Sequence, residues 1–153
     1  MDILRRNTDY GLRMMVELAK HFNGQLMSAR QLASDGNFSY QLGCKILQKL
    51  HKAELVKSNM GPKGGFALNR EPSKITLMEI INVLQGGLRL NRCLVDGEGC
   101  EFQPECEVST RLACLQLYID GYLGGITLAE ILQGQGRIKQ KNHKENIEKG
   151  KNG

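Results

Sequence analysis

The fold is decided by residues 39–70, which read SYQLGCKILQKLHKAELVKSNMGPKGGFALNR. Ser39 precedes a run in which apolar residues recur at helical spacing, as expected for a helix that starts at a serine N-cap and buries one face. That face consists of Leu42, Ile46, Leu50 and Ala53. The second part, LVKSNMGPKGGFALN, has two short apolar-containing runs around glycines and a proline, which supply the backbone angles of a β-hairpin. The stretch therefore predicts a helix followed by a hairpin.

Two further helices are expected before this stretch. Ser28 is the expected N-cap of a short helix, ARQLASDG, which ends at Gly36. Further upstream, apolar residues at heptad spacing predict a helix over residues 8–22, with Thr8 as its N-cap and Asp9 in its first turn. Two helices joined by a short turn form a helix-turn-helix, and the hairpin that follows makes it a winged helix. The predicted fold class is mainly α, a winged helix-turn-helix with a small β-hairpin wing and a long C-terminal dimerisation helix.

That long helix follows a fourth helix, which is predicted between its N-cap Thr76 and the pair Gly86–Gly87. The long helix covers residues 107–123, where apolar residues alternate between four- and three-residue spacing, the pattern of two helices that pack along their length. These seam residues are Val108, Leu112, Leu115, Ile119 and Tyr122. The helix is a dimerisation candidate, although the seam could instead pack on its own winged helix. Thr127 is the expected N-cap of a last short helix.

Length and charge indicate how the chain is organised. Its 153 residues suffice for one core with extensions. Residues 1–70 carry 11 Lys/Arg and 5 Asp/Glu, whereas residues 71–133 carry 4 and 9. We expect a winged-helix domain over residues 1–75, a segment with a cysteine loop and dimerisation helices over 76–133, and a basic disordered tail over 134–153. The N-terminus lacks the apolar core of a secretion signal, so we expect a cytoplasmic protein that does not bind membranes.

The third helix and the hairpin carry polar and basic residues suited to DNA. A recognition helix places its first side chains on base edges, and a wing places basic groups on the neighbouring backbone or minor groove. The outward positions are Ser39, Tyr40, Gln41, Lys45 and Lys49 on the helix, and Lys57, Asn59 and Lys63 on the hairpin. With the positive charge of the N-terminal half, they predict binding to double-stranded DNA. The alternative is a solvated face or a protein-binding face, because winged helices also bind proteins.

The cysteine loop is a candidate metal site. Cys93, Cys100 and Cys106 lie in a Gly- and acid-rich stretch between two helices. Clustered thiols in a reducing compartment are more often metal ligands than disulfides. The loop lacks the closely spaced cysteine pair of structural zinc sites, which disfavours zinc, whereas an iron–sulfur cluster accepts a longer loop but usually needs four ligands. Cys44 and Cys114 are expected to be packing residues.

Four stretches resemble a known family. They are TDYGLRMMVELA in the first helix, the run of residues 39–70 quoted above, the cysteine loop ending in QPEC, and ITLAEIL near the end. Over residues 3–133 the chain resembles the Rrf-type family of bacterial winged-helix iron–sulfur transcription regulators, relatives of NsrR, IscR and RirA that also include the cluster-free CymR. The TDYGLR and PEC contexts are most similar to the nitric-oxide-sensing NsrR branch. Met60 stands where relatives often carry an arginine, which changes an expected DNA contact.

The resemblance implies a homodimer with one iron–sulfur cluster per subunit, held by Cys93, Cys100 and Cys106. The NsrR-like pattern favours a 4Fe–4S cluster, and 2Fe–2S clusters also occur among the relatives. In that branch the fourth ligand is an aspartate in the first helix of the other subunit, and the matching residue here is Asp9. In the IscR branch it is a histidine three residues after the last cysteine, where this chain has Ser109.

The function that follows is a transcriptional repressor whose operator affinity is controlled by the cluster, which senses nitric oxide, redox state or iron supply. Its partners are then double-stranded DNA and a second subunit, with no small-molecule substrate beyond the signal. No catalytic motif such as GxSxG or a Walker phosphate loop is present, so we do not expect an enzyme. Two alternatives stay open: an iron–sulfur electron-transfer or cluster-carrier protein, and a zinc-stabilised winged-helix interaction module.

Overall fold

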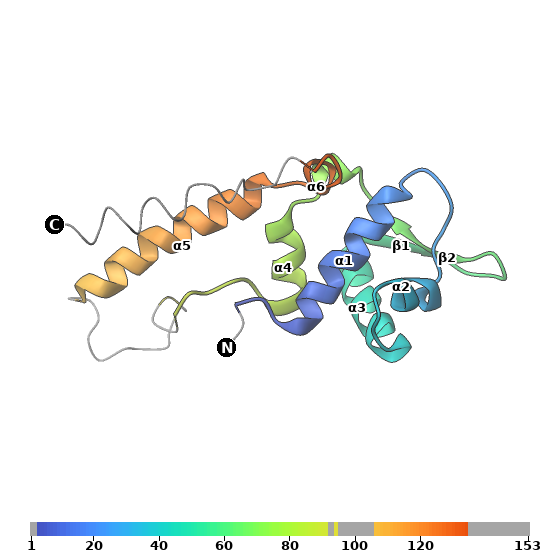
Figure 1. Cartoon of the computed structure of the whole chain (residues 1–153), viewed down its shortest axis with the longest axis horizontal. Coiled ribbons are helices and arrows are strands. Elements are labelled where there is room, and N and C mark those ends of the chain that lie inside the picture. Colours follow the sequence, from blue (N-terminus) through green and yellow to red (C-terminus); the bar gives the residue numbers. More distant parts are fainter. Residues whose placement is uncertain (1–2, 92–93, 95–105, 135–153) are drawn as a thin grey trace, which may run out of the picture.

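The computed structural model describes residues 3–91, 94 and 106–134 of the chain. The elements in order are α1 (Arg6–Lys20), α2 (Ala29–Asp35), α3 (Tyr40–Lys52), β1 (Val56–Asn59), β2 (Gly65–Leu68), η1 (Pro72–Lys74), α4 (Leu77–Gln85), α5 (Glu107–Gly125) and α6 (Leu128–Leu132). Helices α1 to α3 and the two strands gather at one end of the molecule, and α5 extends toward the other (Figure 1). The mainly helical winged helix-turn-helix predicted from the sequence is confirmed.

The helix-turn-helix owes its boundaries to two serine caps. The Ser28 hydroxyl accepts a hydrogen bond from the Gln31 amide at 3.1 Å and starts α2. The Ser39 hydroxyl accepts one from the Leu42 amide at 3.3 Å and starts α3. Each cap satisfies an amide that the first helical turn leaves without a backbone partner. Both predicted N-caps are therefore confirmed.

The wing is an antiparallel pair of strands in which Val56 lies opposite Leu68 and Asn59 lies opposite Gly65. Phe66 of β2 also exchanges backbone hydrogen bonds with Met27, which precedes α2, at 2.8 and 3.0 Å. This bridge attaches β2 of the wing to the helix-turn-helix. The loop between the strands projects beyond the rest of the fold (Figure 1).

One hydrophobic core joins the winged helix to the later helices. Met15 of α1, Leu47 of α3, Ile80 of α4 and Leu128 of α6 are completely buried and belong to the same cluster. The core thus includes residues on both sides of position 75. The boundary between the two segments at that position stays a prediction, because the two segments share one core.

The start of α1 differs from the prediction. The helix begins at Arg6, and its N-cap is Arg5, which makes no side-chain capping bond. Thr8 is not the cap: its amide already bonds to the carbonyl of Arg5 at 2.8 Å, and its side chain is buried. Its hydroxyl has no hydrogen-bond partner among the described residues. The helix starts earlier without a side-chain cap of its own: the Gln85 side chain accepts a hydrogen bond from the Arg5 amide at 3.1 Å, and Thr8 is buried in the first turn.

Helix α5 exposes most of its apolar side chains. Val108, Leu115 and Tyr122, spaced seven residues apart, are 66%, 47% and 59% exposed. Gln116 is the buried residue of this helix. The described part of the chain therefore leaves three of the five seam residues exposed, whereas Leu112 and Ile119 are half-buried. None of the helices in the described ranges combines the length and apolar composition that a bilayer span requires.

Candidate DNA interface and cluster-ligand positions

The head of α3 presents three polar side chains to solvent. Ser39, Tyr40 and Gln41 are all exposed, as the sequence predicts for residues that approach base edges. Ser39 has a second role, because its hydroxyl also caps the helix. The side chain of Cys44, one turn further along, raises the pKa of Tyr40 above the ordinary tyrosine value, at which the hydroxyl is already protonated at neutral pH. The head of α3 thus offers uncharged hydrogen-bonding groups.

The two lysines of α3 differ in their surroundings. Both are exposed, but the Nζ atom of Lys49 donates a hydrogen bond to the carbonyl oxygen of Leu84 at 3.2 Å. Leu84 lies near the C-terminal end of α4, where a cation complements the helix dipole. Lys45 makes no such bond within the described part of the chain. Lys45 is therefore the freer of the two to bind a phosphate.

The predicted wing residues lie at exposed positions. Lys57 and Asn59 are on β1, and Lys63 is in the turn between the strands. Met60, in the same turn, is 99% exposed, so no other described residue shields it. The wing thus combines basic side chains with one apolar side chain at its tip.

The lysines of this surface lack local carboxylate partners. Five other basic residues do pair with carboxylates, as Arg13–Asp9, Lys20–Glu17, Arg70–Glu79, Lys74–Glu71 and Arg89–Asp120. Lys45, Lys57 and Lys63 have no carboxylate partner among the described residues. Their charges are not compensated locally, so they add to the positive potential that attracts phosphates.

Arg30 of α2 is a residue of this surface that the sequence pattern did not reveal. Its guanidinium carbon lies 5.7 Å from the centre of the Tyr40 ring. The two residues are ten positions apart and belong to different helices, so periodicity within one helix gives no signal of their contact. A basic residue in the first turn of the helix before a recognition helix is the signal that could have indicated it.

Of the proposed thiol ligands, Cys106 belongs to the described residues, and Cys93 and Cys100 lie outside them. Cys106 is the N-cap of α5, and its sulfur accepts a hydrogen bond from the Ser109 amide at 3.4 Å. Amide hydrogen bonds to sulfur are common at iron–sulfur sites, and a sulfur bound to iron can keep this one. No group of three metal-binding side chains occurs among the described residues.

Asp9, the proposed fourth ligand, has an accessible carboxylate on α1. Its side chain is 46% exposed, and its Oδ2 atom lies 3.0 Å from a guanidinium nitrogen of Arg13. Such an exposed ion pair contributes little to stability, on the order of 0.2–1 kcal/mol. The carboxylate is therefore available to a metal ion that can compete with Arg13 for it.

The other two cysteines are separate from this set. Cys44 is half-buried on α3, and Cys114 is exposed on α5. A packing role for Cys114 thus requires a neighbour that the described part of the chain does not supply.

Gln116 holds the segment that leads into the cysteine loop against α5. Its side chain accepts a hydrogen bond from the Leu90 amide at 2.9 Å and donates one to the Leu88 carbonyl at 2.8 Å. It also donates to Asp120 at 2.7 Å. Because this side chain is buried and its amide is satisfied, it fixes residues 88–90 beside α5, the helix whose N-cap is Cys106.

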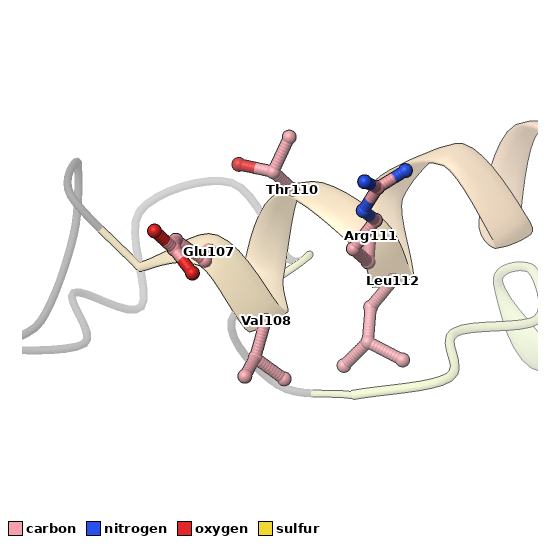
Figure 2. A pocket seen from close by; sticks show the side chains of 5 residues that line it. All are labelled: Glu107, Val108, Thr110, Arg111 and Leu112. Carbon is pink, nitrogen blue, oxygen red and sulfur yellow. The ribbon is translucent and has the colours of Figure 1, made fainter.

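The first turns of α5 border a cavity of about 660 Å³. Its lining residues are Glu107, Val108, Thr110, Arg111 and Leu112. Figure 2 shows Val108 and Leu112 on one side of the helix, and Thr110 and Arg111 on the other. The apolar pair belongs to the predicted seam.

The profile of the Rrf2 family, described as an iron-dependent transcriptional regulator, matches residues 4–134. The chain belongs to the Rrf2 family. The Rrf2 match runs from α1 through α6 and therefore includes both the candidate DNA interface and the cysteine loop.

Several Rrf2 relatives match over most of their length. CymR of Bacillus subtilis is 35% identical over 121 residues, which cover 73% of this chain and 88% of that protein. NsrR of Bacillus licheniformis is 29% identical over 140 residues, 90% of this chain and 96% of that protein. The solved structure of T. potens IscR has a TM-score of 0.70 at 28% identity and covers 89% of this chain and 90% of its own.

These comparisons establish the general function. The matching CymR and NsrR proteins are named HTH-type transcriptional regulators, so this Rrf2 chain is a helix-turn-helix transcriptional regulator and not an enzyme. The match to CymR, NsrR and IscR does not distinguish the NsrR branch from the others.

Proposed function

We propose that this Rrf2 protein binds a double-stranded DNA operator as a cytoplasmic homodimer and represses transcription under the control of an iron–sulfur cluster. The observation that carries the proposal is the surface formed by the head of α3 and the wing. Its lysines Lys45, Lys57 and Lys63 are exposed and have no carboxylate partners among the described residues. Such a surface attracts phosphates, while Tyr40 and Gln41 can reach base edges.

The proposed dimer forms through α5. An apolar seam on a helix of 19 residues is suited to pack against the same helix of a second subunit. Val108, Leu115 and Tyr122 are exposed in the single chain at seven-residue intervals, so a partner helix would bury all three on one stripe. Dimerisation places two recognition helices at a fixed separation, as binding to a near-palindromic operator requires.

The proposed cluster is held by Cys93, Cys100 and Cys106, with Asp9 of the other subunit as the fourth ligand. Thiolates suit iron–sulfur clusters, and the position of Cys106 at the head of α5 is compatible with this role. The description of the family as iron-dependent also supports it. When bound, the cluster supplies the group that nitric oxide, oxidants or iron shortage can alter. A 4Fe–4S cluster is the favoured form, and a 2Fe–2S cluster is the second possibility.

Anaerobic purification followed by iron, zinc and acid-labile sulfide analysis tests the cluster. We expect a coloured protein with iron and sulfide, whose absorption is lost in Cys106→Ala and retained in the control variants Cys44→Ala and Cys114→Ala. A colourless protein with stoichiometric zinc would support the zinc-stabilised module instead. A metal-free protein that still binds DNA specifically would identify a cluster-free regulator.

DNA binding separates the regulator from the electron-transfer or cluster-carrier alternative. An electron carrier does not need an unpaired basic surface around a recognition helix, whereas a regulator does. Selection from a pool of random duplexes should therefore enrich one sequence with near-palindromic half-sites. Iron and sulfide in a protein that enriches no duplex would favour the carrier.

A further inference from the structure

Arg30 lies beside the head of the recognition helix although it belongs to α2. Its guanidinium carbon is 5.7 Å from the centre of the Tyr40 ring, within the range of a cation–π contact. Tyr40 is the first residue of α3 and is 52% exposed. The two side chains therefore form a bridge between α2 and α3 on the surface that faces DNA in the proposed function.

The charge of Arg30 is available to an external anion. The residue is exposed, and no carboxylate within residues 3–91, 94 and 106–134 forms an ion pair with it. Arg13, in contrast, is paired with Asp9. A guanidinium that stacks on a ring through its face keeps the N–H donors along its edge free for a phosphate. Arg30 thus resembles the unpaired lysines of α3 and the wing more than it resembles Arg13, Arg70 and Arg89, which are paired.

The Tyr40 ring has a neighbour on its own helix as well. Cys44 lies one turn further along α3, and its interaction with Tyr40 raises the pKa of the tyrosine hydroxyl. Tyr40 therefore has contacts from α2 and from α3 before any DNA binds. A side chain that is already restrained loses less rotamer freedom on binding.

We propose that Arg30 is a DNA-contacting residue that also positions Tyr40. Its guanidinium edge binds a backbone phosphate next to the bases that the head of α3 reads, and its face holds the Tyr40 ring in the orientation for reading. The inference rests on the proposed DNA-binding function and extends the contact surface from α3 and the wing to α2.

We test these roles by measuring the affinity of each variant for two DNA duplexes. One is enriched by the wild-type protein from a random pool, and the other is a shuffled duplex of the same composition. Arg30→Gln should reduce the affinity for both duplexes roughly eightfold at about 0.1 M salt. The decrease of log K with log salt should also become shallower by about 0.9, as expected for one lost phosphate contact. Lys74→Gln is the matched control, because it removes the same charge from η1. That control should keep the wild-type affinity and slope.

Arg30→Lys separates positioning from charge. The ammonium should preserve the salt slope but stack less well on the ring, so the preference for the enriched duplex should fall by several-fold. In a Tyr40→Ala background the same replacement should no longer change this preference, because the ring that it positions is absent. An unchanged preference for Arg30→Lys with intact Tyr40 would remove the positioning role.

The outcomes also distinguish this inference from the proposed function. If Arg30→Gln binds both duplexes with wild-type affinity and slope while Lys63→Ala does not, the protein binds DNA without Arg30 and the inference is wrong. If the wild-type protein enriches no duplex, the proposed DNA-binding function fails and the inference fails with it. Arg30 is exposed, so thermal melting of its variants should match the wild type and exclude misfolding as the cause.

Discussion

The Nζ atom of Lys49 donates a hydrogen bond to the carbonyl oxygen of Leu84 at 3.2 Å, and it thereby ties the recognition helix to the end of α4. Gln85, the last residue of α4, bonds in turn to the chain before α1, by accepting from the Arg5 amide at 3.1 Å and donating to the Ile3 carbonyl at 3.2 Å. The end of α4 therefore joins the recognition helix to the N-terminal segment. It also lies directly before residues 88–90, which Gln116 holds against α5.

Lys49→Met should destabilise the fold more than Lys45→Met. The first removes a hydrogen bond between two helices and a cation from a helix C-terminus, with a cost of about 1 kcal/mol. The second removes an exposed charge with no described partner, so its effect on stability should stay within about 0.5 kcal/mol. Urea denaturation measures both. DNA affinity should show the opposite order, because Lys45 is the lysine free to bind a phosphate.

The helix starts that were predicted correctly depend on local chemistry. Ser28, Ser39, Thr76 and Thr127 each accept a hydrogen bond from an amide three residues later, so the sequence around them contains the whole signal. Thr8 has the right residue type for such a cap but not the right place. At the start of α1, Thr8 is buried and the Arg5 amide bonds to Gln85, 80 positions away, and neither feature can be inferred from the neighbouring sequence.

The contacts that the sequence did not reveal are the ones that join distant residues. Lys49 bonds to a carbonyl 35 positions away, and Gln116 bonds to the backbone of Leu90 and Leu88, 26 and 28 positions away. A lysine or a glutamine at such a position looks like an ordinary surface residue, because backbone carbonyls and amides carry no sequence signature. The exposed positions of α3 were predictable because helical periodicity determines which side of a helix faces outward.

Replacing Tyr40 or Gln41 with alanine should reduce affinity for the enriched duplex by about 1–3 kcal/mol, as expected for a lost base contact. Lys63→Ala should instead weaken binding to enriched and shuffled duplexes alike and flatten the salt dependence. Titration at fixed salt separates the two patterns. Wild-type affinity in both α3 variants would contradict the docking of this helix on base edges.

Gly64→Ala should disrupt the wing. A Cβ at this position would collide with the carbonyl oxygen of Asn59 across the turn, and backbone atoms on both sides leave it no room to move. DNA affinity should therefore fall at least as far as in Lys63→Ala. Met60→Ala is the control in the same turn, because the Met60 side chain is 99% exposed and its loss should leave stability unchanged within about 0.5 kcal/mol.

Gly11→Ala should destabilise the fold although alanine favours helices. A Cβ here would overlap with the side chain of Leu84 and come within 3.3 Å of Ile46, so either the buried Leu84 side chain must shift or α1 must move away from α3 and α4. Overpacking of this kind costs about 1–3 kcal/mol, more than the roughly 0.5–1 kcal/mol that alanine gains in helix propensity.

Gly121→Ala is the matched control on α5, where no described atom lies within 4 Å of the new Cβ. It should be neutral or stabilising in thermal melts of the monomer. If Gly11→Ala proves as stable as Gly121→Ala, the close approach of α1 to α4 is not a constraint on the fold. A loss of dimer affinity in Gly121→Ala would place the partner helix at this position.

Asp9→Ala should make the cluster more labile without unfolding the protein. Removal of the carboxylate leaves three thiol ligands, so iron loss to a chelator and reaction with nitric oxide should both become faster. The lost ion pair with Arg13 is exposed, and with the helix-dipole contribution its removal should cost less than about 1 kcal/mol. Arg13→Gln breaks the same ion pair but keeps the carboxylate, so it should retain a wild-type cluster. If the cluster is equally labile in the two variants, the Asp9–Arg13 ion pair, rather than ligation by Asp9, stabilises the cluster.

Mixed dimers decide which subunit donates Asp9. One subunit carries Asp9→Ala with its cysteines intact, and the other carries Asp9 with Cys93, Cys100 and Cys106 all replaced by alanine. In the cross-subunit arrangement the single remaining cysteine loop faces the intact Asp9 of its partner, so its cluster should decay at the wild-type rate. If that cluster decays as fast as in the Asp9→Ala homodimer, the ligand comes from the same chain or Asp9 is not a ligand. The cross-subunit result would also explain how the cluster can control DNA affinity, because α1, which carries Asp9, packs in one core with the recognition helix α3.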